Sequence, residues 1–190
     1  MIQGRCDESV LTDKGIADAK LVGKALNAVK IDGFYCSPLQ RAKQTAEIIH
    51  SSLNTPPALQ PTQELMEVDL PLWEKMRKEE VQVKYEQEYR LWKEQPEQFK
   101  MVLPDGQEHY PVLALYEQAK KFWQSLIAQY QQKTVLIVAH NGINRCLIMS
   151  AVGIKPERYH SIQQSNCCVN VLNFSGDFGS PVQILSLIHI

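Results

Sequence analysis

The stretch "TVLIVAHNGINR", residues 134–145, decides the fold of this chain. Residues 134–139 are apolar or β-branched, as in a buried β-strand. His140 stands at the end of this run, and the Asn-Gly pair after it opens a segment that resembles a helix start. His140 is therefore either a polar residue that happens to end a strand or a side chain that points into a reaction site.

The rest of the chain alternates strand-like and helix-like segments. Apolar side chains at helical spacing predict helices over residues 11–29, 38–50, 112–130 and 142–152. Short apolar or alternating runs predict strands over residues 34–37, 64–70, 134–139, 168–174 and 181–190. This alternation favours an α/β fold, a three-layer sandwich with a mostly parallel central sheet and helices on both faces.

Local signals mark helix starts and loops. Thr12 is a predicted N-cap of the first helix, and Ser37-Pro38 predicts an N-cap and a first helical residue for the second. Residues 54–62 are rich in proline and predict a loop. Residues 73–111 are first charged and aromatic and then turn-like, so we interpret them as a helical insertion that caps a site.

Composition excludes several classes of function. The chain has 190 residues, of which 44% are hydrophobic and 22% charged, so residues 1–190 are interpreted as a single domain. A net charge of -1, without a Lys/Arg run longer than two, gives no electrostatic case for nucleic acid or a membrane surface. No stretch approaches ~18 apolar residues, so no membrane span is predicted. The five cysteines show no Cys-x-x-Cys spacing, which favours a reducing, cytoplasmic setting over a zinc site or a disulfide framework.

Polar side chains accompany three of the predicted strands. Arg41 lies just after the strand at 34–37, Glu67 lies in the next strand, and His140 ends the third. Ligands of open α/β sheets bind beyond the carboxyl ends of strands, where cations beside helix starts suit a phosphate and a carboxyl group could protonate a leaving oxygen. Taken singly, Arg41 could be a surface helix residue, Glu67 a solvated strand residue and His140 a satisfied interior histidine.

Four segments of the chain resemble the histidine phosphatase (phosphoglycerate mutase-like) superfamily, in the same order. Residues 37–49, "SPLQRAKQTAEII", are similar to its S-x-L-x-R-A-x-x-T-A signature, and residues 136–145, "LIVAHNGINR", to its second-histidine segment. Residues 2–19, "IQGRCDESVLTDKGIADA", resemble the segment after its catalytic motif, and residues 66–74, "MEVDLPLWE", stand where its acid/base glutamate lies. Within the superfamily, the chain resembles the 2-carboxyarabinitol-1-phosphate phosphatase-like branch most.

The resemblance implies a phosphomonoester hydrolase that acts on a small phosphorylated metabolite through a phosphohistidine. It assigns Arg41 to clamping the phosphoryl oxygens as a fork of donors. It assigns His140 to stabilising charge on the transferring group, with help from the helix start behind it. It assigns Glu67 to protonating the leaving oxygen and then activating water.

The resemblance also implies residues that contact the substrate. Gln3 and Gly4 match positions that line the substrate side of the pocket, together with Arg41, and the backbone N–H of Asn141 would face the phosphate. Neither a metal nor another cofactor is implied, because cationic side chains do the charge work that Mg²⁺ does in kinases. The expected partner is a small metabolite, and the sequence does not predict an oligomeric state.

The chain departs from the family at its nucleophile. The family's catalytic histidine lies in an Arg-His-Gly motif that ends its first strand, and no Arg-His-Gly occurs in this sequence. We therefore expect a fragment that lacks this strand and is inactive as it stands. None of His50, His109, His160 and His189 has a strand-end context that could substitute for the nucleophile.

Three functions stay open from the sequence. The chain could be most of a phosphomonoesterase, with phosphoglycerate mutase activity as a variant of the same chemistry in the full-length protein. It could be a nucleophile-free module that holds phosphorylated ligands through Arg41 and His140. It could also be a structural α/β interaction domain in which these side chains have no ligand.

Overall fold

The central sheet of the protein consists, within the described residues, of three parallel strands. The computed structural model describes residues 1–176 and 182–186. The strand β1 (Gly33–Cys36) lies between β2 (Leu59–Pro61) and β5 (Val135–Val138). The carboxyl ends of β1 and β5 therefore lie side by side, which brings the residues after them together.

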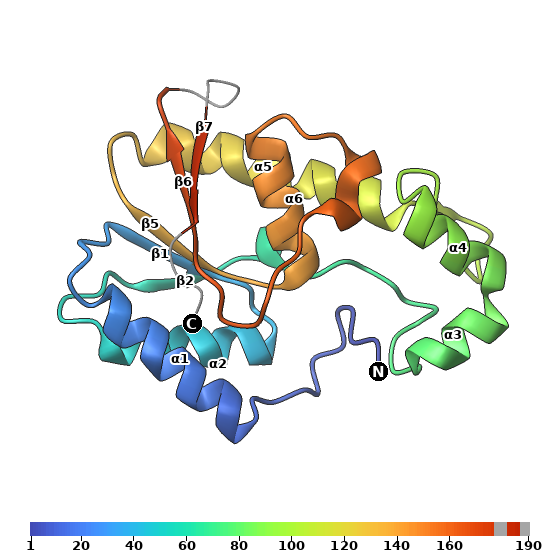
Figure 1. Ribbon diagram of the computed structural model, residues 1–190, viewed down its shortest axis with the longest axis horizontal. Coiled ribbons are helices and arrows are strands. Elements are labelled where there is room, and N and C mark those ends of the chain that lie inside the picture. Colours follow the sequence, from blue (N-terminus) through green and yellow to red (C-terminus); the bar gives the residue numbers. More distant parts are fainter. Residues whose placement is uncertain (177–181, 187–190) are drawn as a thin grey trace.

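Helices cover both faces of this sheet (Figure 1). On one face lie α1 (Asp13–Leu26) and α2 (Gln40–Ser52), and on the other lie α5 (Pro111–Gln129) and α6 (Asn141–Ala151). The side chains of β5 alternate between two hydrophobic clusters: Leu136 and Val138 pack in the cluster of α1 and α2, whereas Val135, Ile137 and Ala139 pack in that of α5 and α6. This alternation follows from the two-residue period of a strand. The structure confirms the expected α/β architecture with helices on both faces.

A helical segment extends away from the sheet at one side of the molecule (Figure 1). It contains α3 (Lys78–Lys84), α4 (Glu86–Glu94) and a hairpin of β3 (Met101–Val102) and β4 (Glu108–His109). Trp73 is 1% exposed and lies at the centre of this segment, in ring contact with Tyr85, Tyr89, Trp92 and Phe99. Both α3 and α4 fall within residues 73–100, where we expected a helical excursion.

The last described part of the chain is a short helix and a hairpin. The helix η2 (Pro156–Ser161) follows α6, and β6 (Asn170–Phe174) pairs antiparallel with β7 (Val182–Ser186). The strand that we expected over residues 181–190 thus covers 182–186, and its remaining positions lie outside the described residues. No helix in the described part of the chain is long and apolar enough to cross a bilayer.

Two local predictions for the segment after α2 are wrong. The predicted loop at residues 54–62 contains β2, in which Pro61 is tolerated because β2 lies at the edge of the described sheet. Residues 64–70 do not form a strand; they begin within a turn of 3₁₀ helix, η1 (Gln63–Leu65), and continue without regular structure. The side-chain amide of Gln118, on α5, donates hydrogen bonds to backbone carbonyls of this segment.

The start of α2 also differs from the prediction. Thr12 caps α1 as expected, since its hydroxyl accepts a hydrogen bond from the N–H of Gly15 at 3.1 Å. In contrast, α2 begins at Gln40 with Leu39 as its N-cap, so Ser37-Pro38 does not start the helix. The Ser37 hydroxyl accepts a hydrogen bond from the N–H of Leu39 at 3.3 Å, just before the helix, and also lies 2.7 Å from a ring nitrogen of His140. Ser37 therefore contacts the residue after β5 as well as the chain before α2, and the local Ser-Pro motif did not indicate this second contact.

Candidate active site

A cavity of about 1530 Å³ runs along β5 and past its carboxyl end. Arg41, Glu67 and His140, which are far apart in sequence, all line it. They come from the first turn of α2, from the irregular segment after η1 and from the end of β5. The structure thus brings one guanidinium, one carboxyl group and one imidazole around the same space.

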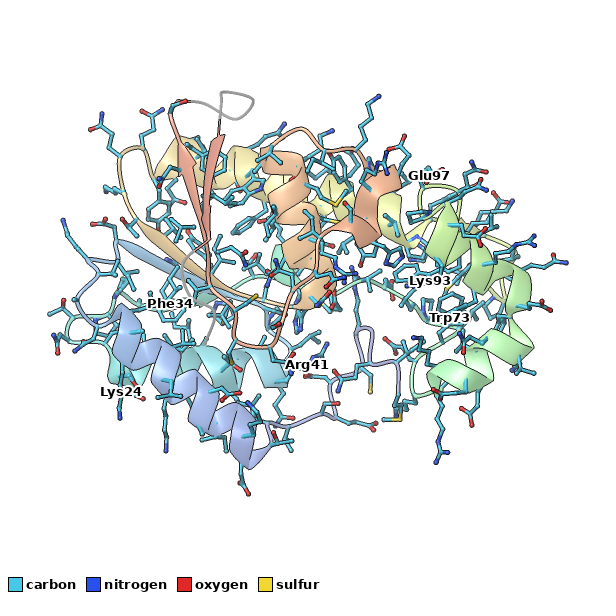
Figure 2. All side chains as sticks on the ribbon, viewed as in Figure 1. Lys24, Phe34, Arg41, Trp73, Lys93 and Glu97 are labelled. Atoms are coloured by element: carbon cyan, nitrogen blue, oxygen red, sulfur yellow. The ribbon has the colours of Figure 1, made fainter. Side chains whose placement is uncertain are left out.

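The Arg41 guanidinium is anchored to the N-terminal loop. Its Nη1 donates to the carbonyl of Cys6 and its Nη2 to the carbonyl of Gly4, both at 2.9 Å. Figure 2 shows Arg41 at the end of α2 nearest this loop. Burial lowers the pKa of Arg41, and the nearby charge of Glu67 opposes that effect. Arg41 therefore combines a structural role, orienting residues 4–6, with a charge at the cavity wall.

Gly4 has a local reason to be glycine. Its φ of 51° lies in the left-handed region, and an added Cβ would lie 2.8 Å from a carboxylate oxygen of Glu74. This backbone conformation accompanies the carbonyl contact with Arg41. Gly4 lines the cavity, as does Gln3, whose side-chain amide donates to the hydroxyl of Ser9 at 2.9 Å. Both predicted substrate contacts thus lie at the cavity.

His140 is nearly buried, with 7% of its surface exposed. Burial, and to a smaller extent the positive charge of Arg41, lowers the pKa of His140 to about 3. The imidazole is therefore neutral at pH 7 in the absence of a bound anion. Its Nε2 lies 2.7 Å from the hydroxyl of Ser37, which is itself fully buried at the end of β1. That contact fixes the orientation of the ring between the two strands.

Glu67 is held by the first turn of α6. One carboxyl oxygen, Oε2, accepts from the N–H of Gly142 at 3.0 Å, and the other, Oε1, accepts from Ile143 at 3.1 Å and from Val68 at 2.8 Å. Burial raises the pKa of Glu67, while these three N–H groups and the charge of Arg41 oppose the rise. The carboxyl group thus occupies N–H groups of the α6 start that we expected to assist His140.

The position of Glu67 depends on residues that sequence reasoning missed. A Cβ at Gly142 would lie 2.4 Å from Oε1 of Glu67 and 2.6 Å from the hydroxyl of Tyr159, so only glycine leaves room for both groups. Arg5 donates from Nε to the backbone carbonyl of Glu67 at 2.9 Å. No local motif marks Arg5, Gly142 or Tyr159. For the partner of His140 the sequence did offer a signal, because Ser37 is a polar residue at the end of β1.

Asn141, the first residue of α6, lies at the rim of the cavity. Its side chain is exposed and donates to the backbone carbonyl of Gln164 at 3.1 Å. This contact ties the start of α6 to the loop before β6. The expected role of its backbone N–H toward a phosphate stays a prediction.

The other histidines within the described residues contact backbone carbonyls. A ring nitrogen of His50 lies 3.1 Å from the carbonyl of Pro57, and one of His109 lies 3.1 Å from that of Asp69. His160 lines the cavity and lies 2.6 Å from the carbonyl of Trp92. His189 lies outside the described residues.

The cavity continues as a groove along β5. Among the described strands, β5 pairs with β1 alone, and its other edge faces the cavity. All four residues of β5 are partly exposed, and on the far side the cavity is lined by residues of β6, including Leu172 and Phe174. An unpaired strand edge presents a row of free N–H and C=O groups. The groove can therefore accept an extended segment of polypeptide.

Comparison with known proteins places the chain in a family. Residues 1–184 match the histidine phosphatase superfamily (branch 1). A probable 2-carboxy-D-arabinitol-1-phosphatase of Arabidopsis thaliana is 38% identical over 182 residues, which are 95% of this chain and 36% of that protein. Phosphoserine phosphatase 1 of Hydrogenobacter thermophilus is 28% identical over 90% of this chain and 77% of that protein.

Solved structures agree with this assignment. Bacillus stearothermophilus YhfR superimposes with a TM-score of 0.82 at 26% identity, over 96% of this chain and 87% of that one. The chain spans about a third of the length of the plant relatives that it matches, 36% of one and 34% of the other. With a match over nearly its whole length, the chain belongs to the histidine phosphatase superfamily, branch 1.

Proposed function

We propose that the cavity binds the phosphoryl group of a small phosphorylated metabolite, and that Arg41, His140 and Glu67 are the residues that act on it. The observation that carries this proposal is that these three side chains line one cavity. The charge of Arg41 also acts on the pKa of both other groups, so the three are electrostatically connected. A phosphoryl group is a small anion that such a set can recognise.

The geometry suits a division of labour during phosphoryl transfer. Arg41 supplies N–H donors to the phosphoryl oxygens, and the neutral imidazole of His140 can donate one N–H as charge develops there. A bound dianion would counter the effect of Arg41 and raise the pKa of His140. Arg41 and His140 would then both donate hydrogen bonds to the transferring group.

Glu67 is suited to the role of general acid. Its raised pKa favours the protonated carboxyl group that a general acid needs. Oε2 accepts a single hydrogen bond whereas Oε1 accepts two, so we place the transferable proton on Oε2. After the proton moves to the leaving oxygen, the resulting carboxylate could activate a water molecule.

We propose that the nucleophile lies outside this sequence, so that the chain by itself binds phosphate without turning it over. No Arg-His-Gly occurs in its 190 residues, and the groove along β5 has room for a strand that would deliver this motif beside His140. A histidine on that strand would form a bond to phosphorus as the leaving oxygen departs, and water would then release phosphate.

The substrate and setting are further parts of the proposal. Two of the relatives are named for a sugar-acid phosphate and for phosphoserine, so we propose a metabolite of similar size for this chain. We propose that residues 73–111 cap the cavity within one domain, because Tyr89, Trp92 and Lys93 line it. We also propose a reducing, cytoplasmic setting, since each of the five cysteines is a free thiol. Mutase activity of a longer protein, or phosphate binding alone, are the alternatives.

Calorimetric titration with vanadate and inorganic phosphate tests the binding. The wild-type chain should bind both, and Arg41→Gln should weaken binding by about ten- to a hundredfold, because it removes a charged donor. Lys43→Gln on the exposed side of the same helix is the matched control and should leave affinity unchanged. Circular dichroism checks that loss of the contacts with Gly4 and Cys6 has not unfolded Arg41→Gln. No binding by the wild-type chain would contradict the proposal.

The nucleophile is tested separately. Hydrolysis of p-nitrophenyl phosphate should be absent for the chain alone. It should appear when an apolar strand that ends in Arg-His-Gly is joined to Met1 through a connecting loop long enough to place the strand in the groove. Replacing the histidine of that segment by alanine is the control. Turnover by the unextended chain would overturn the assignment of the nucleophile but not that of the phosphate site.

A further inference from the structure

Arg5 connects the N-terminal loop to the segment that carries Glu67. Its Nε donates to the backbone carbonyl of Glu67 at 2.9 Å, and its Nη2 donates to Oε1 of Gln118 at 3.1 Å. Its Nη1 lies 3.7 Å from a carboxylate oxygen of Asp69, so each nitrogen of the guanidinium has a partner. Arg5 does not line the cavity. Its side chain therefore acts on this segment rather than on a ligand.

Gln118, on α5, holds the same segment and does not line the cavity either. Its side-chain Nε2 donates to the carbonyls of Glu64 and Met66 at 2.9 and 3.0 Å, while its Oε1 accepts from Arg5. Because carbonyls only accept and a guanidinium only donates, these three contacts fix the orientation of the amide. After η1 the segment has no regular structure, so side-chain donors take the place of helix or sheet partners. Gln118 thus anchors Arg5 and the segment to a helix whose next residue, Ala119, is fully buried.

The N-terminal loop also contacts the cation of the proposed phosphate site. The guanidinium of Arg41 donates to the carbonyls of Gly4 and Cys6, the residues on either side of Arg5. Figure 1 shows this N-terminal segment between α2 and the helical excursion. These three consecutive residues therefore link Arg41 to the backbone of Glu67.

Glu67 is held at both ends. Three backbone N–H groups bind its carboxyl oxygens, and Arg5 binds its backbone carbonyl. Several rotatable bonds separate these two ends, so fixing only one of them would leave the other free to move. With both ends fixed, the acid has one position relative to Arg41. A displacement of about 1 Å can cost on the order of a hundredfold in rate, so this position matters for proton transfer.

We propose that Arg5, supported by Gln118, is a positioning residue that places the carboxyl group of Glu67 next to the leaving oxygen of a phosphoryl group bound at Arg41. This inference rests on the proposed function and deepens it, because it names residues outside the cavity that determine where the acid lies. The substrates most affected are esters of alcohols, since an alkoxide leaves only with a proton from an acid. Esters that release a stabilised phenolate need the acid far less.

The uptake of a proton can report where Glu67 lies. A bound phosphate dianion raises the pKa of a carboxyl group beside it, so the chain takes up protons when phosphate binds. Arg41, Tyr159 and Cys146 also interact electrostatically with Glu67, but arginine stays protonated. Burial raises the pKa of the Tyr159 phenol and of the Cys146 thiol, so neither group ionises below about pH 9. The difference in proton uptake between wild type and Glu67→Gln is therefore the share of Glu67, because phosphate itself contributes equally in both.

Calorimetry of inorganic phosphate in buffers of different ionisation enthalpy measures this uptake between about pH 5 and pH 9. Wild type should take up more protons than Glu67→Gln. Arg5→Gln should lose more than half of that difference, because the freed segment lets the carboxyl group move away from the phosphate. Adding Arg5→Gln to Glu67→Gln should change nothing further. A role of Arg5 in stability alone would lower the melting temperature of Arg5→Gln and leave the uptake unchanged.

Two further variants serve as controls. Arg5→Lys keeps the charge and one donor without the fork, so it should recover part of the proton uptake. Arg90→Gln removes an exposed arginine of α4 that does not line the cavity, and it should behave as wild type.

The extended protein that carries the Arg-His-Gly strand gives a second readout. Arg5→Gln should lower kcat/KM for glycerol 1-phosphate, an alkyl ester, by about ten- to a hundredfold. For p-nitrophenyl phosphate the change should be about twofold or less, because its phenolate leaves without a proton from an acid. An equal loss with both esters would indicate a general defect of the site and contradict the positioning role.

The outcomes distinguish this inference from the function on which it rests. If the wild-type chain does not bind phosphate, the proposed function fails and the positioning role fails with it. If wild type binds phosphate and Arg5→Gln keeps the full proton uptake, the positioning role is wrong and the phosphate site stands. Equal uptake by wild type and Glu67→Gln would overturn the assignment of Glu67 and, with it, that of Arg5. Should Arg5→Gln not fold, Gln118→Met takes its place and must reduce the uptake; an unchanged uptake in that variant would overturn the inference.

Discussion

The neighbouring strands β1 and β5 are equally long and have very different surroundings. Each has four residues in the sheet, and both are apolar. In β1, Phe34 and Cys36 are fully buried, whereas every residue of β5 is partly exposed. The cause is strand pairing: among the described strands, β1 has a partner on both sides and β5 has one, with the groove on its other side. An apolar run therefore predicts a strand but not how completely that strand is covered.

The candidate site takes residues from both the covered strand β1 and the open strand β5. Ser37 follows the covered strand and His140 follows the open one, and their side chains are 2.7 Å apart. The covered strand supplies a fixed hydroxyl that orients the imidazole. The open strand leaves space along which a ligand or another segment can approach. Rigidity and access thus come from adjacent strands of one sheet.

The largest expected effect comes from truncating matched residues of the two strands. Phe34 and Leu136 are level with each other in the parallel register and pack in the same cluster with α1 and α2. Phe34→Ala should lower the free energy of unfolding by about 3–5 kcal/mol, because it leaves a cavity in a fully buried site. Leu136→Ala should cost roughly half as much, because its side chain is already partly exposed. Urea denaturation of both variants measures the difference, and equal costs would show that β5 is covered in solution.

The next prediction tests whether the imidazole of His140 is shielded from water as completely as the side chains of β1. The pKa of His140 is about 3 in the folded chain, against an ordinary value of 6.5, so the unfolded chain takes up this proton first as pH falls. Burial of the neutral His140 ring therefore contributes stability above pH 6.5. This stability is lost as pH decreases toward 3, and the free energy of unfolding falls by about 1.4 kcal/mol per pH unit. Urea denaturation gives the free energy of unfolding of wild type and of His140→Asn between pH 7 and 5. As pH falls below 6.5, wild type should lose stability relative to the variant with this slope. Parallel curves would mean that water reaches the imidazole.

The smallest effect concerns the glycine that faces Glu67. Gly142→Ala places a Cβ 2.4 Å from the Glu67 carboxyl group and should lower the free energy of unfolding by about 1–3 kcal/mol through overpacking. Gly15→Ala in α1 meets its nearest atom at an ordinary 3.5 Å and should raise stability by about 0.4–1 kcal/mol. Thermal melts of the pair give the comparison. Stabilisation by both substitutions would show that Glu67 can move away without cost.

The elements with a strong local period were predictable from the sequence. The strands β1 and β5 are apolar runs, and α1, α5 and α6 carry apolar stripes, so their type and order were found with ends displaced by a few residues. The strand end at His140 was also visible, because a polar residue interrupts a buried run. Such signals depend on neighbours in sequence alone, so they can be recognised without knowledge of the fold.

The misassigned segments depend on contacts between distant residues. Residues 64–70 alternate like a strand, yet their carbonyls are bound by Gln118, 52 and 54 residues further along, and by Arg5. Similarly, the carboxyl group of Glu67 is positioned by Gly142 and Ile143. These partners cannot be recognised from local spacing. The side chains of the site could thus be named from the sequence, but the network that holds them could not.

The hydrogen bonds from Gly142 and Ile143 to Glu67 turn two backbone amides into reporters of a single proton. A carboxyl group that gains a proton becomes a weaker acceptor, so the nitrogen chemical shifts of both amides must change as Glu67 titrates. Nuclear magnetic resonance can therefore follow the acid through its own scaffold, without a label or a substrate analogue. A ligand that alters the ionisation of this group would change the chemical shifts of the same two amides.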